Sequence, residues 1–415
     1  MWAKRGKKAT LHWLLNGGRG PHMIGPGPTV DGHGIDPTNE WGHDVLWWLD
    51  RMVRSQRPLA EKMTLFWHDH FATSDQQTPL MLRQNKMLRG RALGSFPALL
   101  KAVTTDPAML LFLSLADSDK GAPNENYARE LMELFTLGRG YNEHDIREAA
   151  RALTGFQSRW SRGGNFEGIH YSRENHDRGV KRIFHRRGRF DWHDVVGLVT
   201  HHPAHAPFMV EKLWGFFITK PIDHRSRTKL VRLYRHHRLQ IKPLVGAILA
   251  HPKLYADLDR PDMVKAPLVF LAGALRSTGR YIDDDAWSWI LEEMGQYPFH
   301  PPSVAGWDWG PAWISTNTTR ARFTAVNWLV RQGPLKVEDG STPVGLSPAD
   351  HMERALAATG RPWISSTTAG ALNALIPRFF EDVKPTQTSR MQQRSDMCQR
   401  ALRHLLLSGP DAQLH

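Results

Sequence analysis

The sequence predicts a mainly α-helical fold, a large irregular helical domain interrupted by long loops rich in Gly, Pro and Trp. Apolar residues recur at helical spacing through most of the chain from Trp41 onward, and Gly or Pro stands where these periods stop. Apolar residues make up 41% of the chain and charged residues 23%, so most of it is expected to fold around a core. The longest apolar runs, such as residues 110–116, are far shorter than the ~20 residues of a membrane-spanning helix, so no membrane span is expected.

Changes in composition along the chain predict four regions. Residues 1–40 are rich in Gly and Pro and are expected to form an irregular arm. Residues 41–332 are expected to form the main helical domain, and 351–415 a set of C-terminal helices that pack on it, joined by a linker over 333–350. The length of 415 residues is compatible with one large core or with two packed lobes.

The first helices are predicted from their punctuation. Pro58 opens a segment whose apolar and aromatic side chains are typical of a buried helix ending near Phe71. Two further helices are expected over residues 83–93 and 96–103, because Gly94 interrupts the pattern between them.

A helical hairpin is predicted over residues 124–156. The first helix ends at Gly138, and its apolar stripe includes Tyr127 and Phe135. The second helix begins at Asn142, a suitable N-cap with Asp145 three residues later.

Two long irregular segments break the helical pattern, at residues 157–192 and 297–315. Loops of this length in compact domains are often functional. The remaining helices are expected at 193–201, 207–218, 226–238, 243–250, 264–278, 285–294 and 318–331.

The net charge of +13 is concentrated in two stretches, and residues 159–189 hold nine Arg or Lys against three acids. An anionic partner is therefore conceivable, although a solvated basic surface explains the same charge. No nucleic-acid recognition motif is present, so nucleic acid is not expected as the partner. The single cysteine, Cys398, excludes an internal disulfide and a cysteine-based zinc site.

Three segments resemble the bacterial family known as domain of unknown function 1800. They are FWHDHFATS at 66–74, NENYARELMELFTLG at 124–138 with AARALTGF at 149–156, and PPSVAGWDWGPAWIS at 301–315. The resemblance covers about residues 47–415 and implies a helical, often exported group with no stated activity. The chain itself carries no recognisable signal peptide, which alone points to the cytoplasm, whereas the resemblance implies export.

The histidines of the first segment allow two interpretations. His68 and His70 are about 200° apart on a regular helix, so at most one of them faces a given site. In the first interpretation both are hydrogen-bonded core histidines. In the second, one of them serves as an acid, a base or a metal ligand beside Asp69.

The helix of residues 124–138 carries the strongest candidate for chemistry. Glu130 and Glu133 lie on its polar face together with Asn126, and Asn124 and Arg129 of the same segment are, like Asn126, potential substrate-binding residues. That face is either exposed, with Arg129 pairing with Glu133, or pressed against the Ala-rich second helix. In the second case desolvation raises the pKa of a carboxylate and suits it to general-acid work.

The two irregular segments add further candidates. The first contributes His176, Asp177 and Lys181, and the second contributes Trp307, Trp309 and Trp313. Tryptophans in a Pro/Gly-rich loop either stack on sugar rings or cap the core.

Three functions follow as hypotheses. The first is a hydrolase or lyase of a polysaccharide, with Glu130 and Glu133 as acid and base, His70 or His176 assisting, and Asp177, Asp69 or Asp308 as an alternative partner carboxylate. In it Arg129 and Lys181 hold an anionic group. The second adds a divalent metal held by His68 or His70, Glu130 or Glu133, and His176 or Asp177, although no cofactor is predicted outright. The third is a non-enzymatic basic scaffold that binds an acidic polymer or an exported partner. The sequence leaves the oligomeric state open.

Overall fold

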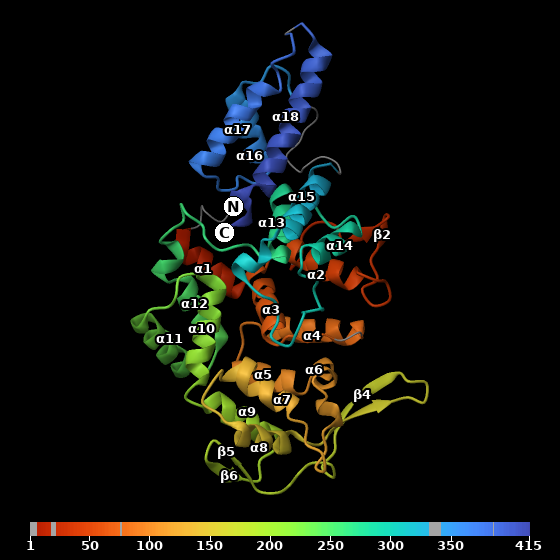
Figure 1. Ribbon diagram of the computed structural model, residues 1–415, viewed down its shortest axis with the longest axis vertical. Helices are drawn as coiled ribbons and strands as arrows, with labels where there is room; N and C mark the ends of the chain where they lie inside the picture. Colours follow the sequence, from red (N-terminus) through yellow and green to blue (C-terminus); the bar gives the residue numbers. More distant parts are fainter. Residues whose placement is uncertain (1–5, 18–21, 75–76, 332–341, 385) are drawn as a thin grey trace. The chain divides into compact units, whose positions relative to one another are not determined.

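A computed structural model describes residues 6–17, 22–74, 77–331, 342–384 and 386–415 (Figure 1). These residues form eighteen α-helices and three two-stranded sheets, so the mainly α fold expected from the sequence is confirmed. The chain divides into two compact units, each built from three segments. Unit 1 contains Met1–Gly20, Gln56–Ala256 and Phe299–Trp307, and unit 2 contains Pro21–Ser55, Asp257–Pro298 and Asp308–His415.

This division differs from the consecutive regions expected from the sequence, because each unit takes up segments that are distant in the chain. Residues 333–341 of the expected linker lie outside the described residues, and α16 already begins at Pro348. The expected irregular arm contains a helix, α1 (Gly6–Asn16). Trp13 is buried there, and Gly17, with φ of 75°, follows the helix. The short apolar face of α1 is covered by tertiary packing, which local composition does not reveal.

Most helices of unit 1 begin with strong local signals. Ser95 and Asp106 cap α5 and α6 by accepting hydrogen bonds from the amides of Ala98 and Met109. The predicted cap of α8 is confirmed, because Asn142 and Asp145 form a reciprocal capping box. The α-helices of unit 1 after α1 are α3 (Pro58–His70), α4 (Thr78–Arg91), α5 (Phe96–Thr104), α6 (Pro107–Phe112), α7 (Asn126–Glu130), α8 (Glu143–Leu153), α9 (Trp192–His201), α10 (His205–Phe217), α11 (His224–His236) and α12 (Ile241–Leu249). Short 3₁₀ turns occur at η2 (Leu115–Asp117) and η4 (Pro252–Tyr255).

The helix predicted over residues 124–138 changes its winding halfway. After α7 the chain forms a π-helical turn, η3 (Leu131–Thr136). The amide of Leu137 donates to the carbonyl of Met132, five residues earlier, at 3.0 Å. Such turns are rare and occur frequently at functional sites.

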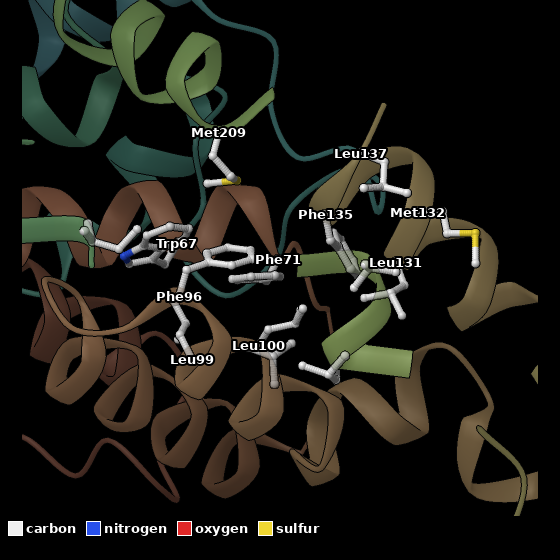
Figure 2. Packing of buried hydrophobic residues seen from close by; sticks show 14 of the residues in the cluster. Trp67, Phe71, Phe96, Leu99, Leu100, Leu131, Met132, Phe135, Leu137 and Met209 are labelled. Atoms are coloured by element: carbon white, nitrogen blue, oxygen red, sulfur yellow. The ribbon is translucent and has the colours of Figure 1, made fainter. Parts of the chain in front are cut away.

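Aromatic side chains of α3, α5 and η3 form the centre of the unit 1 core (Figure 2). The rings of Phe71 and Phe135 meet edge to face with centroids 5.3 Å apart, and Trp67 lies beside both Phe71 and Phe96. The Trp67 indole donates a hydrogen bond to the carbonyl of Ala92 at 2.8 Å, so its polar atom is satisfied inside the core.

The long excursion at 157–192 consists mainly of two antiparallel hairpins. They are β3 (Phe156–Trp160) with β4 (Phe166–Tyr171), and β5 (Lys181–Ile183) with β6 (Arg186–Gly188). In the view of Figure 1 the β3–β4 ribbon projects beyond the helices of its unit. The β5–β6 hairpin is fixed to α8, because the amides of Phe184 and Arg182 donate to the carboxylates of Asp145 and Glu148, each at 2.8 Å.

Unit 2 is built around α2 and α13, with a separate core among its last three helices. Arg276 of α13 donates to three carbonyls at the end of α2, between 2.9 and 3.1 Å. Its elements are β1 (Thr29–Val30), β2 (His33–Gly34), α2 (His43–Arg54), α13 (Pro267–Thr278), α14 (Ala286–Glu293), η5 (Gly310–Trp313), α15 (Thr316–Arg331), α16 (Pro348–Ala358), α17 (Ser366–Arg378), α18 (Thr388–Ser408) and η6 (Pro410–Gln413). Among the described residues, no helix is long and apolar enough to cross a membrane.

Candidate functional site

Two buried histidines hold the end of the π-helical turn. The Nε2 atom of His70 lies 3.0 Å from the carbonyl oxygen of Phe135, and the Nδ1 atom of His205 lies 3.1 Å from that of Thr136. A helix end leaves carbonyls without intrahelical donors, and the two imidazoles supply them. Burial lowers the pKa of His70 to about 3 and that of His205 to about 4, so both rings are neutral at pH 7.

The neighbouring side chains of α3 fix the segment Phe299–Trp307. His68 accepts a hydrogen bond from the amide of Phe299 at 3.1 Å, and Asp69 accepts one from the amide of Trp307 at 2.9 Å. Gly306, with φ of 84°, lies so close to Asp69 that an added Cβ would be 2.4 Å from its Oδ1 atom. Burial lowers the pKa of His68 to about 3. The first motif segment therefore contacts both the 124–138 segment and the start of the 301–315 segment, and His68 and His70 lie in the core.

Glu130 and Glu133 remain together on the outer face of α7 and η3. Glu130 is half-buried and Glu133 is exposed. Burial, followed by the charge of Glu133, raises the pKa of Glu130 above its ordinary value. Burial also raises the pKa of Tyr141, and the negative charges of Glu133 and Glu130 raise it further. This carboxylate pair with a phenol close by is the part of the predicted acid–base site that the structure brings together.

Arg129 has partners other than the one expected for an exposed helix. Its guanidinium binds both carboxylate oxygens of Glu143, at 2.7 and 2.8 Å, and approaches Glu125 at 3.3 Å. It therefore joins the start of α8 to α7 rather than pairing with Glu133.

The asparagines predicted to bind substrate stabilise the turn before α7. The side chain of Asn124 accepts from the amide of Asn126 at 2.8 Å and donates to the carbonyl of Ser114 at 3.2 Å. Asn126 itself is exposed.

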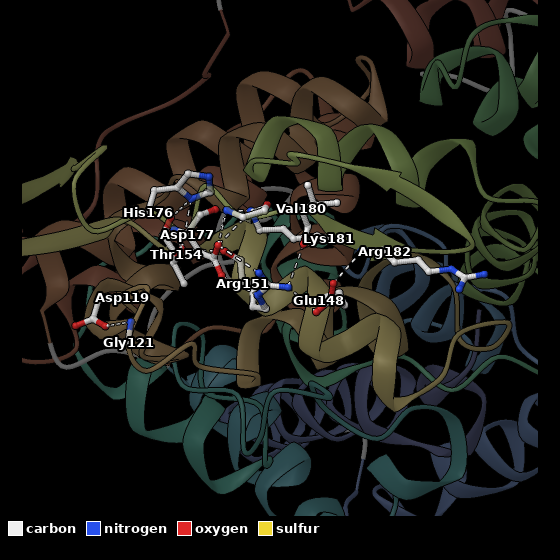
Figure 3. Close-up of polar contacts among 11 residues, drawn as sticks. Asp119, Gly121, Glu148, Arg151, Thr154, His176, Asp177, Val180, Lys181 and Arg182 are labelled. Atoms are coloured by element: carbon white, nitrogen blue, oxygen red, sulfur yellow. Dashed lines mark hydrogen bonds and ion pairs between the residues drawn. The ribbon is translucent and has the colours of Figure 1, made fainter.

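His176, Asp177 and Lys181 belong to a polar network with Arg151 and Glu148 of α8 (Figure 3). Asp177 binds Arg151 at 2.7 Å, and Arg151 also binds Glu148 at 2.8 Å. The ammonium group of Lys181 is fully buried, donates to the carbonyls of Asp177 and Gly179, and lies 3.9 Å from the Asp177 carboxylate.

His176 lies 3.0 Å from the carbonyl of Thr154, whose hydroxyl accepts a hydrogen bond from the amide of Asp177 at 2.8 Å. Burial lowers the pKa of His176 below its ordinary value, and the hydrogen bond to the Thr154 carbonyl opposes part of this decrease. The network anchors the chain before β5 to α8. Asp177, Lys181 and one ring nitrogen of His176 thus have partners within the protein.

The three loop tryptophans do not form one exposed wall. Trp307 is 7% exposed and packs against His68 in unit 1, with ring centroids 5.7 Å apart. Trp309 and Trp313 belong to unit 2. Trp313 is 4% exposed, and only Trp309, at 36%, offers a substantial surface. Trp307 and Trp313 therefore follow the alternative interpretation of the sequence, in which they cap the core.

The described residues contain no group of three or more His, Cys, Asp or Glu side chains arranged to hold a metal ion. One ring nitrogen of His68 and one of His70, the Nε2 atom in each case, contact a backbone group. A divalent metal held by one of these histidines, by Glu130 or Glu133, and by His176 or Asp177 stays a prediction that elemental analysis of the purified protein tests.

The two hairpins expose a dense set of arginines. The eight exposed arginines between residues 159 and 189 are Arg159, Arg162, Arg173, Arg178, Arg182, Arg186, Arg187 and Arg189. Within the part of the chain that the structure describes, none of their guanidinium groups forms an ion pair with a carboxylate. Trp160, between Arg159 and Arg162, is 47% exposed. We define these eight arginines and Trp160 as the arginine surface.

Two features of unit 1 were missed by sequence reasoning. Trp160 was not singled out, although its position between Arg159 and Arg162 indicated that its side chain would be exposed. Tyr141 was also missed, because its proximity to Glu133 depends on the turn between η3 and α8.

Comparison with known protein families shows which family the chain matches. The family described as "Protein of unknown function (DUF1800)" matches residues 35–414, nearly the whole chain. No curated protein and no solved structure matches the chain.

Proposed function

Because the chain belongs to the DUF1800 family, whose description assigns no activity, we propose a function from its own geometry: unit 1 binds an acidic polysaccharide through the arginine surface. The observation that carries this proposal is the set of eight exposed arginines without carboxylate partners among the described residues. Glu167 and Glu174 are exposed in the same segment, but the arginines outnumber them. A surface with an excess of one charge sign attracts and concentrates polymers of the opposite sign.

Trp160 favours a carbohydrate as the polymer. Its indole nitrogen donates to the hydroxyl of Ser158 at 3.0 Å, and Phe166 packs against it edge to face with centroids 5.3 Å apart. The ring is thus held in place while 47% of the residue stays exposed. An exposed indole face offers a flat apolar surface that suits a sugar ring.

Binding to hyaluronate, with neutral dextran as the control polymer, tests the proposal. We expect the double variant Arg159→Glu/Arg162→Glu to bind hyaluronate at least about tenfold more weakly than the wild type. The matched control is Arg320→Glu/Arg378→Glu, which reverses two exposed arginines of unit 2. Trp160→Ala should weaken binding without changing its dependence on salt. Equal losses in both double variants, or tighter binding to double-stranded DNA than to any acidic polysaccharide, would contradict the proposal.

A second candidate function is cleavage of the same polymer. It is supported by the raised pKa of Glu130 beside Glu133 and Tyr141, since a raised pKa makes a carboxyl group better suited to act as a general acid. Long incubation with acidic polysaccharides, followed by detection of new reducing or unsaturated ends, tests it. We expect Glu130→Gln to abolish any product, with Glu125→Gln as the control on the same segment. Product formation that survives both Glu130→Gln and Glu133→Gln would overturn the assignment.

A further inference from the structure

A polar cavity of about 340 Å³ lies in unit 1 between the β5–β6 turn, the start of α8 and the end of α9. Ligand pockets span roughly 300–1,000 Å³, so this cavity has room for one small polar group or sugar residue. The side chains that give it its chemical character are those of Tyr141, Asp145, His185, Arg186, His201 and His202.

Three side chains of the lining can donate hydrogen bonds to a ligand. Arg186 provides a permanent cation, and His185 and His201 add exposed imidazoles. The one carboxylate of the lining, Asp145, is buried, and its two oxygens accept hydrogen bonds from the amides of Asn142 and Phe184. Both oxygens of the Asp145 carboxylate thus have backbone hydrogen-bond donors.

The backbone around the cavity adopts conformations that cost free energy. Phe184 and His185 have φ values of 48° and 65°, in the left-handed region where this two-residue turn favours Asn and Gly. The ring of Phe184 packs on that of His202, with centroids 4.7 Å apart, so a packing contact accompanies the strained backbone at this position. Non-glycine residues with such strain cluster at functional sites.

Gly140 is needed for the opposite wall. Its φ is 87°, and an added Cβ would lie 2.8 Å from the Cε1 atom of His202. His202 accepts a hydrogen bond from the amide of Ala204 at 3.2 Å, which fixes the orientation of its ring. Arg235 of α11 donates to the carbonyl of Pro203, a lining residue, at 2.9 Å and brings a further cation beside the wall.

We propose that this cavity is an oxyanion site that binds the carboxylate, sulfate or phosphate group of a single sugar residue through Arg186, His185 and His201. The inference deepens the proposed polysaccharide binding and rests on it. The arginine surface attracts the polymer, and the cavity receives one of its charged groups.

Calorimetric titration with sulfate, phosphate and glucuronate at constant ionic strength tests the site. The wild type should bind at least one of them saturably, with one site per chain. Because Arg186 also belongs to the arginine surface, the cavity variant is His185→Gln/His201→Gln, which changes two lining residues outside that surface and should weaken this binding at least tenfold. The matched control is His144→Gln/Arg147→Gln, an exposed pair on α8 outside the lining, and should bind as the wild type does.

The outcomes separate this site from the arginine surface. Absence of saturable binding for all three anions, or equal affinity in the cavity variant and the wild type, overturns the oxyanion site. Saturable binding that only the cavity variant loses establishes it. If the wild type binds the small anions but not hyaluronate, the polymer proposal fails while the anion site stands, and the reverse result leaves the polymer proposal without this site.

Discussion

The imidazole of His70 donates to the carbonyl oxygen of Phe135 from 3.0 Å, across 65 positions of sequence. The contact joins the end of α3 to a π-helical turn whose carbonyls have lost their regular helical donors. It gives His70 a structural role inside the core and leaves the arginine surface as the main candidate for function in unit 1.

Replacing His70 should therefore destabilise the fold. His70→Ala removes a buried ring and leaves the Phe135 carbonyl without its donor, and we expect a loss of about 2–4 kcal/mol in the free energy of unfolding. His224→Ala, at an exposed position on α11, is the control and should change stability by no more than about 0.5 kcal/mol. Chemical denaturation measures both. Equal midpoints for the two variants would show that the contact is unimportant.

Three buried histidines should make the protein less stable in acid. Burial lowers the pKa of His68 and His70 to about 3 and of His205 to about 4, whereas an unfolded histidine titrates near 6.5. Between these values the unfolded chain binds more protons than the folded one, so stability is full above pH 6.5 and falls as the pH drops toward 3. Each histidine contributes a slope of up to about 1.4 kcal/mol per pH unit.

The variant His70→Gln isolates one of these protons. Its free energy of unfolding should depend on pH less steeply than that of the wild type between about pH 4 and 6, by roughly the slope of one histidine. Urea titrations at several pH values provide the comparison. Parallel pH profiles for the two proteins would mean that His70 is protonated inside the fold.

The network around Lys181 predicts a coupled pair of mutations. Asp177→Asn leaves the buried ammonium group of Lys181 without its nearby carboxylate and breaks the ion pair with Arg151. Because Arg151 and Asp177 are partly exposed, we expect a loss of about 2 kcal/mol rather than the full cost of a buried charge. The double variant Asp177→Asn/Lys181→Met should lose less than the sum of the single changes, with Glu174→Gln as the exposed control. Strict additivity would contradict a direct interaction.

Gly140 offers a test of the cavity wall with a matched control. Gly140→Ala forces a left-handed alanine against His202, whereas Gly164→Ala introduces similar backbone strain, φ of 78°, with no atom within 4 Å. We expect the first change to cost at least about 1 kcal/mol more than the second. Thermal or chemical unfolding of the two variants provides the difference. A difference near zero would mean that the His202 ring moves freely out of the way.

Local signals predicted the helices of unit 1 better than their contacts. The Asn142–Asp145 capping box is confirmed because both partners lie within one turn of the chain. The pairing of Arg129 with Glu143 could not be read from helical spacing, since it depends on how α8 folds back against α7. The β5–β6 turn carries Phe184 and His185 where a turn signal would be Asn or Gly, so nothing local indicated a hairpin.

The site predictions also differ according to whether they depend on local spacing or on tertiary contacts. The two carboxylates Glu130 and Glu133 lie close together because they are three residues apart on one face. His70, Asp177 and Trp307 were predicted at the same site, and the structure shows that each also has a tertiary contact of its own. The presence of a polar or aromatic residue in a motif therefore did not reveal whether its side chain would contact the protein core or a ligand in solution.

The salt dependence of hyaluronate binding by the wild-type protein tests the central claim most directly. Binding measured by calorimetry should be readily detectable at about 50 mM NaCl and should weaken by at least tenfold at about 200 mM, because exposed arginines are screened by added ions. Neutral dextran should not bind under either condition. Undetectable hyaluronate binding at low salt, or an affinity that stays constant as salt rises, would contradict the role assigned to the arginine surface.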